Sequence, residues 1–107
     1  MNPIKVITQK IPTMKIANCT YNYFTEQLTQ LASTFPGFIH SESYWNCVNT
    51  SINNSHYTIS DWKSLPDWDR WRFSEERTLF FKNSTIHFEC SHLILNKQNN
   101  IKNFPLL

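Results

Sequence analysis

The stretch DWKSLPDWDRWRFSEER, residues 61–77, decides which fold the chain is expected to adopt. It contains three of the chain's four tryptophans, which are Trp62, Trp68 and Trp71. Ser64 precedes Pro66 and Asp67, and a capping hydroxyl, a first-turn proline and an acidic side chain together are typical of a helix start. We therefore expect residues 65–73 to form a helix that follows the end of a strand.

The spacing of the tryptophans favours one packed helix face. Trp68 and Trp71 are three positions apart, so they share a side of the predicted helix, together with Leu65. Packing in the core is the simplest interpretation. A nucleic-acid stacking platform would need a basic groove, whereas this stretch is rich in acidic residues. A third possibility is that Trp71 lines a ligand pocket, because pockets are lined mainly by such side chains.

The composition narrows the class of protein. The 107 residues suit one domain, and the 15% aromatic content supplies large side chains for a core. A net charge of +2 is weak for a nucleic-acid-binding protein, so no nucleic-acid partner is expected. Gly37 is the single glycine, which excludes the glycine-rich loops that bind nucleotide phosphates.

The chain has three cysteines, an odd number, and no two of them form a C-x-x-C motif. Neither a disulfide framework nor a zinc ribbon is therefore expected. The chain shows neither a signal-like apolar run near its start nor a run of membrane-spanning length. These features predict a cytoplasmic protein that does not associate with membranes.

The segments before residue 61 predict a strand, a helix and two further strands. Residues 4–11 are rich in β-branched side chains and read as a strand. In residues 18–35 the apolar side chains recur at spacings of three and four, which predicts one helical face, and Gly37 ends it. Residues 38–45 and 56–62 are predicted to be the two strands of a hairpin.

The segments after the tryptophan stretch predict a second helix start and a last strand. Ser74 is followed by Glu75 and Glu76, which indicates that the helix breaks and restarts there. Residues 84–96 read as a strand, and a tail that is first polar and then apolar follows it.

The order of these elements is β-α-β-β-α-β, which predicts an α+β fold, the ferredoxin-like plait. Residues 1–96 form the predicted domain and residues 97–107 a C-terminal tail. The two helices can cover only one face of the sheet. Because a bare sheet face of this size is unfavourable in water, a second copy is expected to cover it.

Three motifs in this order resemble the antibiotic-biosynthesis-monooxygenase superfamily, the dimeric α+β barrels. The resemblance covers roughly residues 4–95. The motifs are Pro36-Gly37-Phe38, Trp62-Lys63-Ser64, and Trp71 through Ser74 to Arg77.

This resemblance implies a homodimer with a pocket between helices and sheet in each subunit. It also implies oxygenation of a small aromatic or quinol-type molecule without metal or flavin, so no cofactor is expected. Some members of the superfamily degrade haem instead, with a histidine and an asparagine that fall at Phe81 and Ile7 here. Neither side chain can perform those roles, so haem degradation is disfavoured.

Three residues are the predicted catalytic set. His40 is an acid–base group that is effective near neutral pH, and Tyr44 shares its predicted strand face. These two would form the polar end of the pocket and Trp71 its wall. The predicted role of the polar end is to deprotonate a phenol.

The other candidates have simpler structural interpretations. His56, His87 and His92 lie on predicted strands and on both faces of the sheet, so no converging metal site is expected. Cys90 is predicted to be a buried, inert thiol, and Arg77 to pair at the surface with a neighbouring glutamate.

Two alternatives to an oxygenase remain: a binding module for haem or another flat ligand, and a structural or regulatory dimer with a filled pocket.

Overall fold

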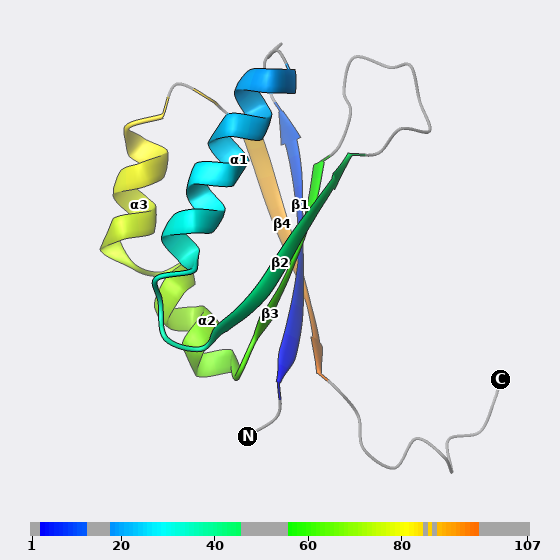
Figure 1. Ribbon diagram of the computed structural model, residues 1–107, viewed down its shortest axis with the longest axis vertical. Coiled ribbons are helices and arrows are strands. Elements are labelled where there is room, and N and C mark those ends of the chain that lie inside the picture. Colours follow the sequence, from blue (N-terminus) through cyan, green and yellow to red (C-terminus); the bar gives the residue numbers. More distant parts are fainter. Residues whose placement is uncertain (1–2, 13–17, 46–55, 85, 87, 97–107) are drawn as a thin grey trace, which may run out of the picture.

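A computed structural model (Figure 1) describes residues 3–12, 18–45, 56–84, 86 and 88–96 of the chain. The strands are β1 (Ile4–Pro12), β2 (Phe38–Trp45), β3 (His56–Trp62) and β4 (Phe88–Asn96). The helices are α1 (Asn18–Ala32), α2 (Leu65–Arg72) and α3 (Glu75–Lys82). The predicted loop between β2 and β3 and the predicted tail lie outside the described residues.

The four strands form one antiparallel sheet in the order β2-β3-β1-β4. All three helices lie against the same face of this sheet (Figure 1). The arrangement confirms the predicted α+β, ferredoxin-like fold. No helix among the described residues is long and apolar enough to cross a membrane.

The register of the central strands decides which side chains face the helices. Ile4 of β1 pairs with Trp62 of β3 and with Asn96 of β4. Since side chains alternate along a strand, the even-numbered residues of β1, β3 and β4 share the helix-covered face. The odd-numbered residues share the outer face. Ile4 and Val6 are thereby buried beneath the helices.

A bulge in β2 changes this alternation at one point. Phe38 pairs with Trp62, but His40 pairs with Asp61, the residue immediately before Trp62 in β3. One extra residue in β2 therefore separates Phe38, which packs against the core, from His40 on the outer face. Regular alternation along β2 would place Phe38 and His40 on one face, and the bulge is the reason that they lie on opposite faces.

The core lies between the sheet and the helices. Its buried members are Ile4, Val6, Phe24, Leu28, Ala32, Trp62, Trp68 and Trp71. The prediction that Trp68 and Trp71 share a packed face is confirmed. Leu65, which was expected beside them, is the first residue of α2 and is exposed.

Two serines begin the two short helices. The backbone N–H of Asp67 donates to Ser64 Oγ at 3.3 Å, and the backbone N–H of Arg77 donates to Ser74 Oγ at 3.1 Å. Both are N-caps, which satisfy a backbone donor that a helix start leaves unpaired. The predicted break and restart of the helix at Ser74 is confirmed.

Gly37 occupies a turn that tolerates no side chain. Its φ is 88°, and a Cβ there would overlap the side chain of Asp67, which Ser64 and Arg70 hold in place. We expect Gly37→Ala to lower the free energy of unfolding by about 2–3 kcal/mol, because it adds backbone strain to a steric clash. Urea denaturation followed by circular dichroism measures this change, and an unchanged midpoint would contradict the assignment.

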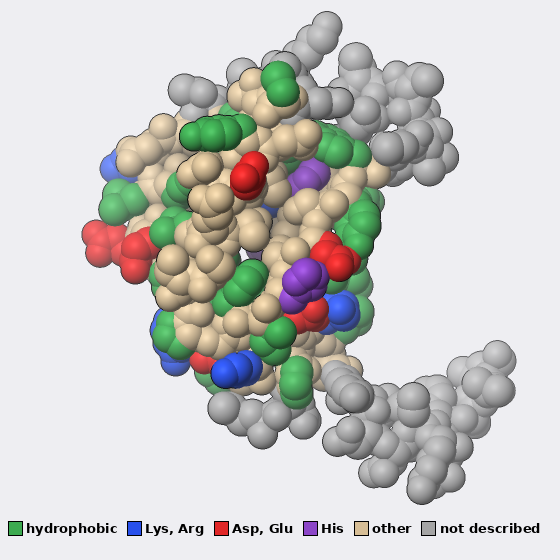
Figure 2. Space-filling view, in the orientation of Figure 1, with side chains coloured by type: hydrophobic (Ala, Val, Ile, Leu, Met, Phe, Trp, Pro, Cys, Tyr) green, Lys and Arg blue, Asp and Glu red, His purple; other side chains and the backbone are tan. Residues whose placement is uncertain are grey.

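The face seen in Figure 2 carries scattered charges. Its Lys and Arg side chains lie singly among acidic and uncharged ones rather than gathered in a patch.

Candidate functional site

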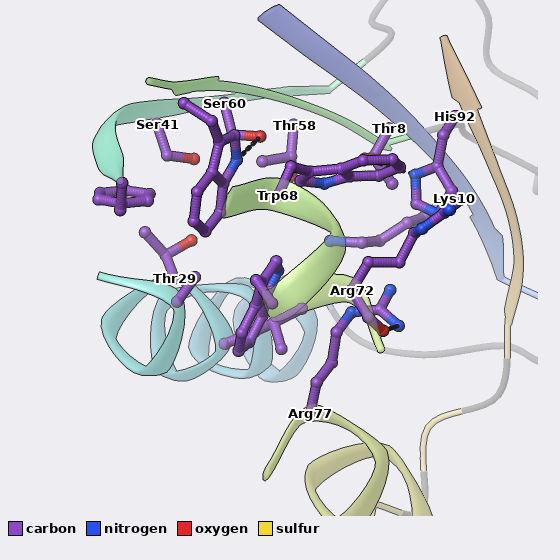
Figure 3. A pocket seen from close by; sticks show the side chains of 15 residues that line it. Thr8, Lys10, Thr29, Ser41, Thr58, Ser60, Trp68, Arg72, Arg77 and His92 are labelled. Carbon is purple, nitrogen blue, oxygen red and sulfur yellow. Dashed lines mark hydrogen bonds between the residues drawn. The ribbon is translucent and has the colours of Figure 1, made fainter. Parts of the chain in front are cut away.

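The candidate site is a cavity between the sheet and the helices (Figure 3). Its volume is about 50 Å³. Every strand and every helix contributes to its lining, so the whole plait is needed to form it. Aromatic rings, small hydroxyl groups and cations meet there, together with Leu28, Ala32 and His92.

Aromatic rings form one wall of the cavity. Trp62 is 1% exposed, its indole N–H donates to Ser60 Oγ at 3.1 Å, and its ring lies edge-to-face with Phe38 at 5.3 Å between centroids. Trp71 packs edge-to-face against Phe35 at 5.0 Å. Such contacts hold the rings in fixed orientations and leave flat apolar surfaces toward the cavity.

Small hydroxyl groups from three adjacent strands form the floor. They face the helices because of the register described above, and they are Thr8, Ser41, Thr58 and Ser60. Each hydroxyl can donate one hydrogen bond and accept others. The floor can therefore bind a carbonyl or a hydroxyl group of a ligand.

Lys10 brings a buried amine to the cavity. It is 3% exposed and lies on the helix-covered face of β1. Burial lowers the pKa of its amine from 10.5 to about 8, and the nearby Arg77 acts in the same direction. An amine with such a pKa is present in both protonation states near neutral pH, as an acid–base catalyst needs to be.

Two arginines reach the same end of the cavity from α2 and α3 (Figure 3). The Arg72 guanidinium lies over the Trp68 ring, 4.4 Å from its centroid, and donates to Asp69 Oδ1 at 3.1 Å. Arg77 donates to the backbone oxygen of Arg72 at 3.4 Å and lies 4.6 Å from the centroid of Phe81. Burial lowers the pKa of Arg77.

His92 lies at the rim, on β4. Its Nδ1 is hydrogen-bonded to Thr8 Oγ1 at 2.9 Å, and its ring meets Trp68 edge-on at 5.3 Å. Burial, followed by the charges of Arg77, Arg72 and Lys10, lowers its pKa to about 4. The ring is therefore neutral at pH 7 and can both donate and accept a hydrogen bond.

The three predicted catalytic residues do not meet in one site of the protomer. Trp71 lines the cavity and is 7% exposed. His40 and Tyr44 lie together on the outer face of the sheet. His40 Nε2 donates to Glu42 Oε1 at 3.0 Å, and the Tyr44 hydroxyl donates to Glu42 Oε2. The bulge in β2 thus moves the predicted polar end to the opposite side of the sheet.

Lys10 is the main residue that the sequence interpretation missed. The signal was present, because Lys10 continues the alternation of Ile4, Val6 and Thr8, all of which face the core. A lysine in the buried phase of a strand is unusual enough to indicate a functional site.

The predicted environments of Cys90 and Arg77 also need correction. Cys90 was expected to be buried but is exposed, since it lies on the edge strand β4. Arg77 was expected to pair with Glu75 or Glu76, yet it lines the cavity and forms no ion pair with any described residue. His87 lies outside the described residues.

The two positions relevant to haem degradation have structural roles. The Phe81 ring packs edge-to-face on Phe24 at 5.8 Å, and Ile7 lies on the outer face between β3 and β4. Within the described part of the chain, no three His, Cys, Asp or Glu side chains are grouped so that they could hold a metal ion.

The sequence matches no protein-family model and no curated protein. In structure, the chain is similar to SnoaB from Streptomyces nogalater, a cofactor-independent oxygenase. The TM-score is 0.75 at 10% sequence identity, over 94% of this chain and 98% of that chain. The two proteins share one fold.

Two further structures extend this likeness. One, from Nitrosomonas europaea, is provisionally assigned as an antibiotic biosynthesis monooxygenase, with TM-score 0.70, 7% identity and coverage of 94% of this chain and 95% of that chain. The other, from Thermobifida fusca, is described as a dimeric ferredoxin-like protein of unknown function, with TM-score 0.68, 7% identity and coverage of 90% and 92%. The resemblance predicted from the three motifs is confirmed at the level of the fold.

Proposed function

We propose that this protein is a cofactor-independent oxygenase that acts on a small phenol or quinol bound in the cavity. The observation that carries the proposal is the Lys10 amine, buried against an aromatic-walled cavity with a pKa of about 8. The fold shared with an oxygenase of this type supports the proposal. Fold alone would not be sufficient support, because function depends on the site.

The proposed reaction begins with transfer of the phenol proton to the neutral Lys10 amine. The resulting ammonium stabilises the phenolate, which is a better electron donor than the phenol. One electron passes to dioxygen, and the phenoxyl radical and superoxide combine to form a carbon–oxygen bond. The peroxide then takes a proton from Lys10. Loss of the ring hydrogen at that carbon, as a proton, breaks the O–O bond and leaves a quinone and water.

The cavity also sets a requirement on this reaction. A volume of about 50 Å³ holds roughly one or two water molecules, whereas sites for drug-sized ligands span about 300–1,000 Å³. A substrate ring can enter only if side chains in the wall move. Arg72 is suited to such movement, because its side chain is 32% exposed and stacks on Trp68 from the rim.

The same volume favours a second candidate function, a structural or regulatory dimer with a filled pocket. In that case the aromatic side chains fill the cavity and no substrate enters. This candidate predicts neither ligand-induced stabilisation nor oxygen consumption.

Oxygen uptake with simple naphthols and hydroquinones tests the proposed function. We expect uptake above the buffer rate, with quinone formed in proportion to the oxygen consumed. The rate should rise with pH to a plateau, with a midpoint near 8, because only the neutral form of Lys10 can accept the phenol proton. An oxygen electrode and the quinone absorbance measure both quantities. Absence of uptake, together with absence of ligand-induced stabilisation, would support the non-catalytic candidate instead.

We also propose that the protein is a homodimer formed through the outer face of the sheet. Ile7 pairs with Ile59 on β3 and with Leu93 on β4, so apolar side chains cross three adjacent strands of this face. Leu93 is 56% exposed and Leu95 is 42% exposed. The dimeric neighbour from Thermobifida fusca supports this assignment.

A charge on the outer face should prevent this dimer. We expect Leu93→Arg to be monomeric where the wild type is dimeric, because association would bury an unpaired guanidinium. Leu79→Arg is the matched control, since Leu79 is similarly exposed but lies on α3. Size-exclusion chromatography with light scattering measures the mass. A monomeric wild type at about 100 μM would contradict the proposal.

A further inference from the structure

Three cationic side chains converge on one end of the cavity (Figure 3), which we call the cationic end. Lys10 reaches it from β1, Arg72 from the end of α2, and Arg77 from α3. Within the described part of the chain, no aspartate or glutamate lines the cavity. The site therefore has an uneven charge distribution that core packing does not require.

The charges of the two arginines at this end are only partly compensated. Asp69 binds Arg72 and is itself outside the cavity lining. Among the described residues, Arg77 donates only to a backbone oxygen, at 3.4 Å, although a guanidinium has five N–H donors. His92 is neutral at pH 7 and so adds no charge. Half-buried cations of this kind are costly unless an anion binds to them.

We infer that the ligand of this cavity is an aromatic carboxylate, with its carboxylate bound by Arg77 at the cationic end and its ring against the tryptophans. This inference rests on the proposed function, because it assigns a substrate class to the same cavity. Arginine matches a carboxylate with two parallel hydrogen bonds, a geometry that the compact ammonium of lysine does not offer. Arg77 would thus bind the carboxylate, and Lys10 would act on the phenol hydroxyl.

The aromatic rings around Arg77 fix its position. Its guanidinium lies against Phe81 and 6.0 Å from the centroid of Trp71. A guanidinium held between rings is already oriented before a ligand arrives, which lowers the entropic cost of binding. The aromatic part of a ligand bound to Arg77 would therefore meet Trp71, the wall residue expected from the sequence.

Benzoate and benzamide provide a matched test, because they have nearly the same shape and differ in charge. NMR titration of the tryptophan indole N–H signals reports binding at the cavity wall. We expect benzoate to bind at least about tenfold more tightly than benzamide. In Arg77→Gln this preference should fall to within about twofold, while the affinity for benzamide stays unchanged. Arg77→Lys, which keeps the charge but loses the two-pronged geometry, should restore part of the preference.

Lys82→Gln is the control, since Lys82 is an exposed cation on the same helix and outside the cavity lining. It should retain the full preference for benzoate. Equal binding of both ligands by the wild type would overturn the inference, yet oxygen uptake with neutral phenols would still support the proposed function. An unchanged preference in a folded Arg77→Gln variant would also overturn it. If neither ligand shifts any indole signal and no phenol is consumed, both proposals fail.

Discussion

Replacing Lys10 by methionine is expected to lower the rate of oxygen uptake by at least about 100-fold, the usual contribution of a positioned acid–base group. Methionine fills a similar volume but can neither accept the phenol proton nor stabilise the phenolate. The free energy of unfolding should not fall, because the substitution removes a buried amine whose charged form is disfavoured by its surroundings. An oxygen electrode and urea denaturation together separate a loss of catalysis from a loss of folding.

Lys5→Met is the matched control for this prediction. Lys5 lies on the same strand but on the outer face, where its Nζ lies 2.9 Å from Asp61 Oδ1 and its side chain is 49% exposed. Its replacement should leave oxygen uptake unchanged, because Lys5 lies on the face of the sheet away from the cavity. The free energy of unfolding should also change little, because an exposed ion pair contributes little to stability. A Lys10→Met protein with full activity would refute the assignment of Lys10 as the base.

Replacing Trp62 by alanine is expected to lower the free energy of unfolding by about 3–5 kcal/mol. Trp62 is 1% exposed, lies edge-to-face with Phe38, and donates its indole N–H to Ser60. Its removal leaves a void at the centre of the core and an unmatched hydroxyl group. Urea denaturation followed by circular dichroism, rather than by tryptophan fluorescence, measures the loss.

Phe73→Ala is the control for Trp62→Ala. Phe73 is 71% exposed and contacts the Arg72 guanidinium at 4.1 Å, so its removal should cost no more than about 1 kcal/mol. Equal losses for the two variants would mean that Trp62 is not a central part of the core.

The boundaries of the elements were predictable wherever local chemistry determines them. The serine caps of α2 and α3 depend on residues within three positions, and both were visible in the sequence. The end of α1 was placed three residues too late. The backbone N–H groups of Thr34 and Phe35 bond three residues back, which tightens the chain into a turn after Ala32. Phe35 therefore packs against the core although it lies beyond the end of the helix.

The composition of the site was harder to predict, because it depends on pairing between distant strands. The bulge that turns His40 away from the cavity exists only in the register of β2 against β3. A shift of one residue moves a side chain to the other face, and no local pattern in residues 38–45 signals it. Arg77 was misplaced for a related reason: its nearest charges in sequence are glutamates, but the packing of α3 directs its guanidinium inward.

The interruption between α2 and α3 has a geometric consequence for the two arginines. Arg72 and Arg77 are five residues apart, and in one continuous helix their side chains would point about 140° away from each other. The chain instead starts a new helix at Ser74, with a different axis. In this second helix, the Arg77 guanidinium lies within hydrogen-bonding distance of the Arg72 backbone oxygen. The break between the two helices thus allows both arginine side chains to reach the same end of the cavity. An uninterrupted helix would be the more regular structure, but it would separate the two guanidinium groups.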